Sequence, residues 1–278
     1  MASKTVKKKT IEFNFSEKHK EYIRKCHECS YNVAEGAVRA GKTVDNIFAF
    51  AHELKTAPDR IHLATGSTVG NAKLNIGDCN GLGLEWIFRG QCHWGKYKDN
   101  EALFVKGPST RWQQKIVIFA GGGKEDSYKK IRGNSYGMWI ATEINLHHDK
   151  TIKEAFNRQL AAKRLKVFWD LNPDNPRAAI YSEYIDRYQK QQEAGEFPGG
   201  YNYMHCTIYD NINITPERLH EIESRYDINS IWYLRDIKGM RWWQRVDLPP
   251  FCRCYQHRIQ HIRDSGQANG PHGDQSGD

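Results

Sequence analysis

The sequence lacks any apolar run long enough to cross a membrane, and no apolar stretch follows its lysine-rich start at Lys4 and Lys7. A membrane span needs about 20 predominantly apolar residues, and a secretory signal needs an apolar segment behind its positive charges. Cysteine is limited to seven residues in a chain of 278, an odd number that favours reduced thiols. We therefore expect no membrane partner and a cytoplasmic location.

Standard metal-ligand spacings are also missing. Cys26 and Cys29 form a close pair, but no second pair follows before residue 36, whereas a structural zinc ion needs four ligands. We interpret this pair as helix-face or core cysteines. A second group of soft ligands, at a spacing that is not standard, comprises Cys252, Cys254, His257 and His261. Metal binding by this second group remains an alternative.

Positive charge and apolar side chains, in contrast, are plentiful. The formal net charge is +8, and hydrophobic residues make up 39% of the chain, with 12% aromatic residues. The apolar content is enough for the packed core of one large domain, with or without an appendage. The charge favours a polyanionic partner, either nucleic acid or an acidic surface.

The most informative stretch fits the pattern G-x-x-x-x-G-K-[ST] of phosphate-binding loops. It consists of Gly36, Ala37, Val38, Arg39, Ala40, Gly41, Lys42 and Thr43. Glycines allow backbone N–H groups to turn toward phosphates, and the following helix presents its free N-terminal donors to them. Lys42 would reach the β- and γ-phosphates, and the Thr43 hydroxyl would bind Mg²⁺. A short strand before the loop and a helix after it complete the expected context.

Continuous apolar runs alternate with helical segments along the rest of the chain. The expected strands are 31–34, 60–65, 115–120, 136–143, 165–171 and 201–209, and residues 85–107 form a strand pair or a loop insertion. The expected helices cover 17–29, 44–51, 69–77, 124–131, 149–162, 178–194 and a segment that starts after Thr215. This alternation is typical of an α/β fold with a mostly parallel sheet covered by helices on both faces.

Composition also divides the chain. Residues 1–10 are expected to be a basic flexible arm, and residues 11–246 a P-loop ATPase domain. From about Asp247 the sequence turns to proline, glycine and small polar residues that cannot bury a core. Residues 247–278 therefore read as an irregular, low-complexity tail.

Hydrolysis of a nucleoside triphosphate needs a positioned water and compensation of charge at the γ-phosphate. Glu143, at the end of an apolar strand, is the expected general base, and Arg39 the expected γ-phosphate contact. An aspartate commonly precedes such a glutamate, but Thr142 stands here and could hold Mg²⁺ only through water. Asp170, at the end of the next apolar strand, could supply part of the missing charge. Arg132 is a second candidate for contact with phosphate.

Several motifs, taken in order, resemble the large subunit of phage terminase of the PBSX type. The resemblance covers residues 13–241 and rests on the phosphate loop with its Arg39, on segments 129–133 and 139–145, and on Phe168-Trp169-Asp170-Leu171-Asn172-Pro173. It implies a P-loop NTPase fold of the ASCE type. It also implies that Asp170 and Asn172 belong to a motif coupling hydrolysis to DNA movement. Segment 15–19 matches an adenine-recognition motif in which His19 replaces the usual glutamine.

The resemblance further implies ATP and Mg²⁺ as cofactors and a motor that packages double-stranded DNA into procapsids in the host cytoplasm. The implied partners are a small terminase subunit and a portal protein, on which the chain would form a homo-oligomeric ring. Such large subunits carry a nuclease domain, whose clustered acids are not found after residue 241, so nuclease activity is not expected. The alternatives are another DNA-stimulated P-loop ATPase, or a truncated prophage remnant that binds nucleotide or DNA without turnover.

Overall fold

The computed structural model describes residues 13–241. The expected basic arm, the expected tail and the cysteine–histidine group at 252–261 lie outside these residues.

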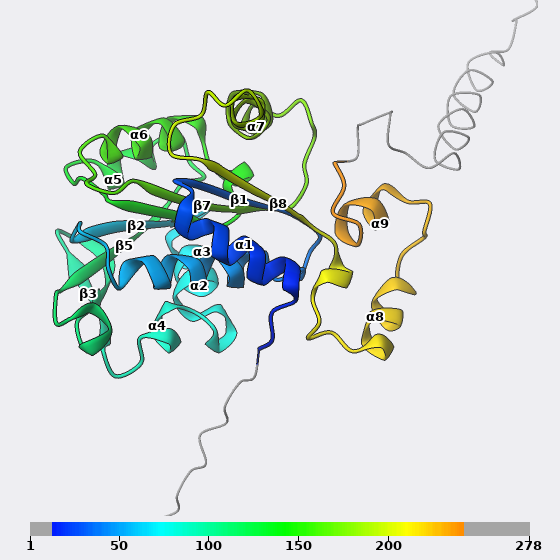
Figure 1. Ribbon diagram of the computed structural model, residues 1–278, viewed down its shortest axis with the longest axis horizontal. Helices are drawn as coiled ribbons and strands as arrows, with labels where there is room; N and C mark the ends of the chain where they lie inside the picture. Colours follow the sequence, from blue (N-terminus) through cyan, green and yellow to red (C-terminus); the bar gives the residue numbers. More distant parts are fainter. Residues whose placement is uncertain (1–12, 242–278) are drawn as a thin grey trace, which may run out of the picture.

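Eight strands form one sheet at the centre of the molecule (Figure 1). Their spatial order is β3-β4-β5-β2-β6-β7-β1-β8. The strands are β1 (Tyr31–Gly36), β2 (Ile61–Gly66), β3 (Cys92–Tyr97), β4 (Asn100–Val105), β5 (Lys115–Gly121), β6 (Met138–Ala141), β7 (Lys166–Leu171) and β8 (Tyr201–Cys206). The six strands from β5 to β8 in this order are parallel, and the β3–β4 hairpin continues the sheet antiparallel to β5. The expected mostly parallel sheet is therefore confirmed, and residues 85–107 contain a strand pair.

Helices cover both faces of the sheet (Figure 1). The α-helices are α1 (Glu17–Glu28), α2 (Lys42–Leu54), α3 (Val69–Ala72), α4 (Leu84–Ile87), α5 (Tyr128–Ile131), α6 (Asp149–Gln159), α7 (Asp186–Glu193), α8 (Pro216–Glu223) and α9 (Ile231–Asp236). Helices α1 to α4 lie on one face, α5 to α7 lie on the other, and α8 and α9 form a small lobe beside the sheet. The parallel strands are therefore buried on both faces, which explains their continuous apolar sequences.

Several helices differ from their expected bounds. The segment expected to be helical at 69–77 begins as α3 and continues as a π-helix, η1 (Lys73–Asp78). The segment at 178–194 likewise starts with a π-helical turn, η5 (Tyr181–Ile185), before α7. Only the last turn of the segment 124–131 is α-helical. Short 3₁₀ turns complete the connections at η2 (Cys79–Gly81), η3 (Pro108–Thr110), η4 (Ile144–Leu146) and η6 (Ile208–Asp210).

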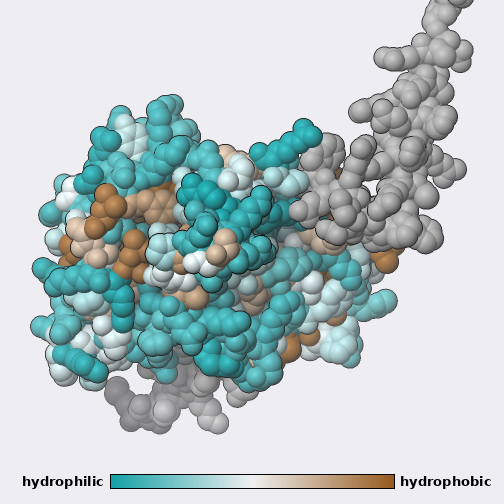
Figure 2. Space-filling model, turned by 45° about the horizontal axis from the view of Figure 1, so that its top comes forward, coloured by the Kyte–Doolittle hydropathy of each residue, from teal (hydrophilic) through white to brown (hydrophobic). Residues whose placement is uncertain are grey.

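Two hydrophobic cores hold the layers together. The core beneath α1 and α2 contains Ile47, Phe50 and Cys26, while the core beneath α6 and α7 is built around Trp139 and Trp169. The burial of Cys26 agrees with its interpretation as a core cysteine. On the face that Figure 2 shows, hydrophilic residues predominate and hydrophobic residues form limited areas. Among residues 13–241, no helix is both long enough and apolar enough to span a bilayer.

Candidate active site

The phosphate loop joins the buried end of β1 to the start of α2. Gly41 has a φ of 101°, a left-handed conformation that glycine adopts without steric cost, and it directly precedes α2. Two carbonyl groups outside the loop hold its backbone in place. The Ala37 amide donates to the Cys206 carbonyl at 2.8 Å, and the Val38 amide donates to the Asp236 carbonyl at 3.1 Å. The expected order of strand, loop and helix is confirmed.

Lys42 lies inside this loop. Its ammonium donates to the carbonyl oxygens of Gly36, at 3.0 Å, and Ala37, at 2.5 Å. It also donates to the Asn172 side-chain oxygen at 3.1 Å, which links the phosphate loop to the segment after β7. Burial lowers the pKa of Lys42, while the nearby Asp170 carboxylate opposes this shift. Together with the N-terminus of α2, Lys42 makes this end of the sheet attractive to phosphate.

The two arginines expected to contact phosphate lie in different parts of the molecule. Arg39 is exposed and has a left-handed φ of 62°, and its carbonyl oxygen accepts a hydrogen bond from the Asn211 side chain at 2.7 Å. Arg132 lies elsewhere, since its guanidinium stacks over the Tyr128 ring and pairs with Glu154 on α6 at 3.4 Å. Of the two arginines, Arg39 is therefore the one that the structure places in the phosphate loop.

Glu143 and Thr142 follow β6 at the same edge of the sheet. Glu143 has a φ of 52°, which is uncommon for a residue with a side chain and often marks functional sites. Its backbone is held by the Asp170 carboxylate, which accepts from its amide at 3.1 Å, and its carbonyl faces the His147 ring at 3.3 Å. Within residues 13–241, the Glu143 carboxylate makes no hydrogen bond or ion pair. It is therefore free to act on a bound water.

Asp170 is the penultimate residue of β7, the strand between β1 and β6. Besides the Glu143 amide, its Oδ1 accepts from the Thr142 hydroxyl at 3.3 Å. Its Oδ2 is buried and has no hydrogen-bond partner among the described residues. Burial raises the pKa of Asp170 to about 6, although the Glu143 amide, Lys42 and Thr43 all favour its charged form. A carboxylate beside the Thr43 hydroxyl is a donor set of hard oxygen atoms, which fits Mg²⁺.

His19 lies directly beneath the loop rather than on the surface. Its side chain is buried, and its Nδ1 pairs with Asp45 in the first turn of α2. The buried Nε2 has no hydrogen-bond partner within residues 13–241. The ring also lies close to Gly41, because a Cβ added at Gly41 would come within 3.3 Å of its Cε1. The structure thus places His19 against the phosphate loop, where it supports α2.

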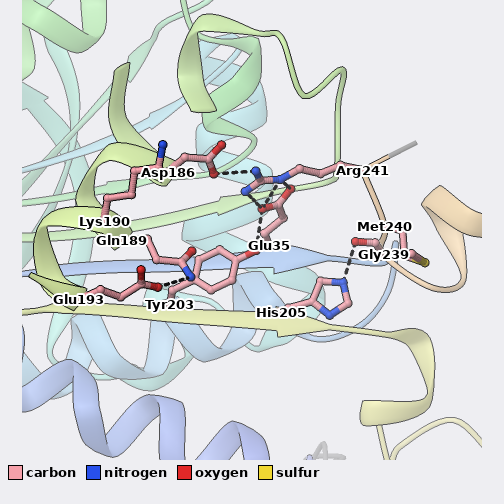
Figure 3. A pocket seen from close by; sticks show the side chains of 10 residues that line it. All are labelled: Glu35, Asp186, Gln189, Lys190, Glu193, Tyr203, His205, Gly239, Met240 and Arg241. Carbon is pink, nitrogen blue, oxygen red and sulfur yellow. Dashed lines mark hydrogen bonds and ion pairs between the residues drawn. The ribbon is translucent and has the colours of Figure 1, made fainter. Parts of the chain in front are cut away.

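A second cluster of polar residues around Glu35 was missed by sequence reasoning (Figure 3). Glu35 is buried immediately before the loop, and its carboxylate accepts from the hydroxyls of Tyr181, at 2.9 Å, and Tyr203, at 2.8 Å. Arg241 donates to both carboxylate oxygens, stacks over Tyr181 and pairs with Asp186 at 2.6 Å. The cluster borders an open pocket of about 510 Å³. The sequence signal that could have indicated this cluster is Glu35 itself, an acidic residue in the buried strand β1.

The topology and the site together define the class of the fold. The phosphate-loop strand β1 and the Glu143 strand β6 are separated by one strand, β7, and the polar residues gather at the carboxyl edge of the sheet. This is the P-loop NTPase fold, in the ASCE arrangement expected from the sequence.

Comparison with solved structures narrows this class. The large terminase of a thermophilic bacteriophage, in complex with ADP, matches 82% of the chain with a TM-score of 0.68 and 19% identity. The large terminase of bacteriophage HK97 matches 91% of the chain (TM-score 0.53, 12% identity). The ATPase domain of the Thermus phage P74-26 large terminase matches 76% (TM-score 0.53, 12% identity). The chain thus has the fold of the ATPase domains of phage large terminases.

The extent of the match differs among these proteins. The chain covers 54% of the ADP-bound terminase and 49% of the HK97 protein, or about half of each, but 89% of the isolated P74-26 domain. No protein-family model matches the sequence, and no curated protein matches it.

Proposed function

We propose that the chain is the ATP-hydrolysing motor subunit, a terminase large subunit, that packages double-stranded phage DNA into procapsids. The observation that carries this proposal is the arrangement of Lys42 and Glu143. Lys42 lies in a phosphate loop, and Glu143 is held in a left-handed conformation two strands away at the same edge of the sheet. Such a pair supplies a phosphate-binding cation and a base for water, the two requirements of triphosphate hydrolysis. The similar structures from the thermophilic bacteriophage include complexes with ADP and with ATP-γ-S.

Each residue would have a distinct role. Lys42 and the free backbone amides at the start of α2 would bind the β- and γ-phosphates, and Glu143 would orient the attacking water and accept its proton. Arg39 would compensate charge on the γ-phosphate. Thr43 would hold Mg²⁺, which neutralises phosphate charge when bound, and Thr142 would contact it through water.

The residues around the loop would connect hydrolysis to recognition and movement. His19 would support the nucleotide side of the loop by fixing Asp45 and the start of α2. Asn172 already contacts the Lys42 ammonium, and Asp170 the Glu143 amide. Both residues would therefore respond to loss of the γ-phosphate, as expected for a motif that couples hydrolysis to DNA movement.

The partners proposed for the motor follow from its task. It would act on double-stranded DNA, be recruited by a small terminase subunit, and form a ring on a portal protein in the host cytoplasm. The net charge of +8 supports a polyanionic partner. Membership of the PBSX-type group is part of the same proposal.

ATP hydrolysis, measured with and without double-stranded DNA, tests the proposal. Wild type should hydrolyse ATP faster with DNA, whereas Lys42→Ala should lose nucleotide binding. Glu143→Gln should bind ATP but lose turnover by about 100-fold or more, because it keeps the shape and removes the base. Lys25→Ala, an exposed lysine on α1, is the matched control. Activity that survives both site substitutions would contradict the assignment, and binding without turnover in wild type would favour the inactive remnant.

A further inference from the structure

The acid that commonly precedes the catalytic glutamate is missing directly after β6, because Thr142 occupies its position. A threonine hydroxyl carries no charge, whereas Mg²⁺ is usually held through at least one carboxylate in addition to phosphate oxygens. Either the site holds the ion without protein charge, or the charge comes from another element.

The register of the sheet identifies that element. Strands β6 and β7 are parallel and adjacent, with Ala141 paired with Trp169, so that the next residues, Thr142 and Asp170, lie side by side. The Thr142 hydroxyl donates to Asp170 Oδ1 at 3.3 Å. The hydroxyl and the carboxylate therefore occupy neighbouring positions on adjacent strands.

We propose that Asp170 provides the protein charge of the Mg²⁺ site, in place of the acid that is absent at Thr142. This inference rests on the proposed function and deepens it. The Oδ1 atom is occupied by Thr142 and the Glu143 amide, but Oδ2 is buried without a hydrogen-bond partner among the described residues. An unpaired buried carboxylate oxygen is costly unless a cation or a bound water meets it. Oδ2 is the atom that would face the ion or its water shell.

The surroundings of Asp170 support this assignment over that of Asp45, the other buried acid near Lys42. Asp45, in the first turn of α2, already has a partner, because its carboxylate is paired with His19. Asp170 instead lies on β7, between β1 and β6, where Lys42 and Thr43 of the phosphate loop are near enough to favour its charged form. The Asp170 carboxylate also accepts from the Glu143 backbone amide. One side chain would therefore position both the Mg²⁺ ion and the general base, Glu143.

Binding of Mn²⁺ to the full chain at saturating ATP-γ-S, measured by electron paramagnetic resonance, tests the inference without turnover. Asp170→Asn should weaken Mn²⁺ binding by about tenfold or more. The exchange Thr142→Asp with Asp170→Thr should restore it, because the acid then stands directly after β6, beside the same ion. Asp45→Asn tests the competing acid. Glu101→Gln, on β4 at the other end of the sheet, is the matched control and should keep affinity near that of wild type, while Thr43→Ala should lose it.

The outcomes separate the inference from the function. If wild type binds Mn²⁺ with nucleotide and Asp170→Asn binds it equally well, the inference is overturned and the ATPase proposal stands. Loss of Mn²⁺ in Asp45→Asn but not in Asp170→Asn overturns it as well. If wild type binds neither nucleotide nor Mn²⁺, the proposed function itself fails. Thermal unfolding shows which variants are folded, and Asp170→Ser replaces Asp170→Asn if the latter does not fold.

Discussion

Replacing Arg241 with methionine would leave the buried Glu35 carboxylate without its counterion. Removing one partner of a buried ion pair costs about 3–5 kcal/mol. We expect the lower end, about 3 kcal/mol, because the hydroxyls of Tyr181 and Tyr203 still donate to Glu35. Methionine keeps much of the apolar contact of the arginine stem, so the charge is the main change. Since Glu35 directly precedes the phosphate loop, nucleotide affinity should fall with stability.

Urea unfolding of wild type and Arg241→Met provides the measurement, with nucleotide affinity as a second readout. A loss of about 3 kcal/mol corresponds to a Tm lower by about 6–12 °C for a domain of this size. The matched control is Arg225→Met, since Arg225 pairs with Glu221 and both side chains are at least half exposed. Solvent screens that exposed pair, so Arg225→Met should lower stability far less than Arg241→Met does.

A double variant separates charge from packing. Glu35→Gln combined with Arg241→Met removes both charges, so it should be more stable than Arg241→Met alone, because no uncompensated carboxylate remains. Equal losses for Arg241→Met and Arg225→Met would refute the reasoning. A double variant less stable than Arg241→Met would also refute it.

Three further predictions concern single side chains. Gly239→Ala should lower the free energy of unfolding by about 2 kcal/mol or more and weaken nucleotide binding. At a φ of +67° the added Cβ would lie 2.5 Å from the Ala37 amide nitrogen. Urea unfolding that is unchanged in this variant would contradict the prediction. Burial lowers the pKa of His62 to about 3 from an ordinary 6.5. The stability contributed by the neutral, buried ring is therefore complete above pH 6.5 and is lost as pH falls toward 3, because the unfolded chain binds the proton more readily. Between pH 7 and pH 5 the free energy of unfolding should fall by about 2 kcal/mol because of this group. His62→Gln should flatten the dependence of unfolding on pH, and the same slope in variant and wild type would count against the prediction. Leu160→Lys, at a residue 83% exposed, should change stability by less than about 0.5 kcal/mol in the same assay.

The parts of the fold that the sequence could predict are those encoded locally. The phosphate loop requires glycine, lysine and threonine at fixed spacing, and β1 and α2 appear on either side of it as expected. Serine and threonine are common helix caps, and the Ser16 and Thr215 side chains each accept from the backbone amide of the third residue of the helix that follows. The apolar runs of β5 and β7 were readable because parallel strands are buried on both faces.

The contacts that join distant segments could not be predicted in this way. No spacing rule relates His19 to Asp45 or Glu35 to Arg241, because each pair depends on how α1 and the end of the described chain pack against β1 and α2. The closeness of Thr142 and Asp170 likewise depends on β6 and β7 being neighbours. The sequence placed both residues at strand ends, but the strand order decides which strand ends meet.

The phosphate loop is completed by residues that are synthesised long after it. Its backbone at Ala37, Val38 and Arg39 is held by Cys206, Asp236 and Asn211, respectively. Contacts so distant in sequence form late, because a long stretch of chain must be ordered first. Nascent chains that end before residue 206 would therefore carry the full glycine–lysine motif without its native shape. Nucleotide affinity would then report on completed folding rather than on the presence of the motif.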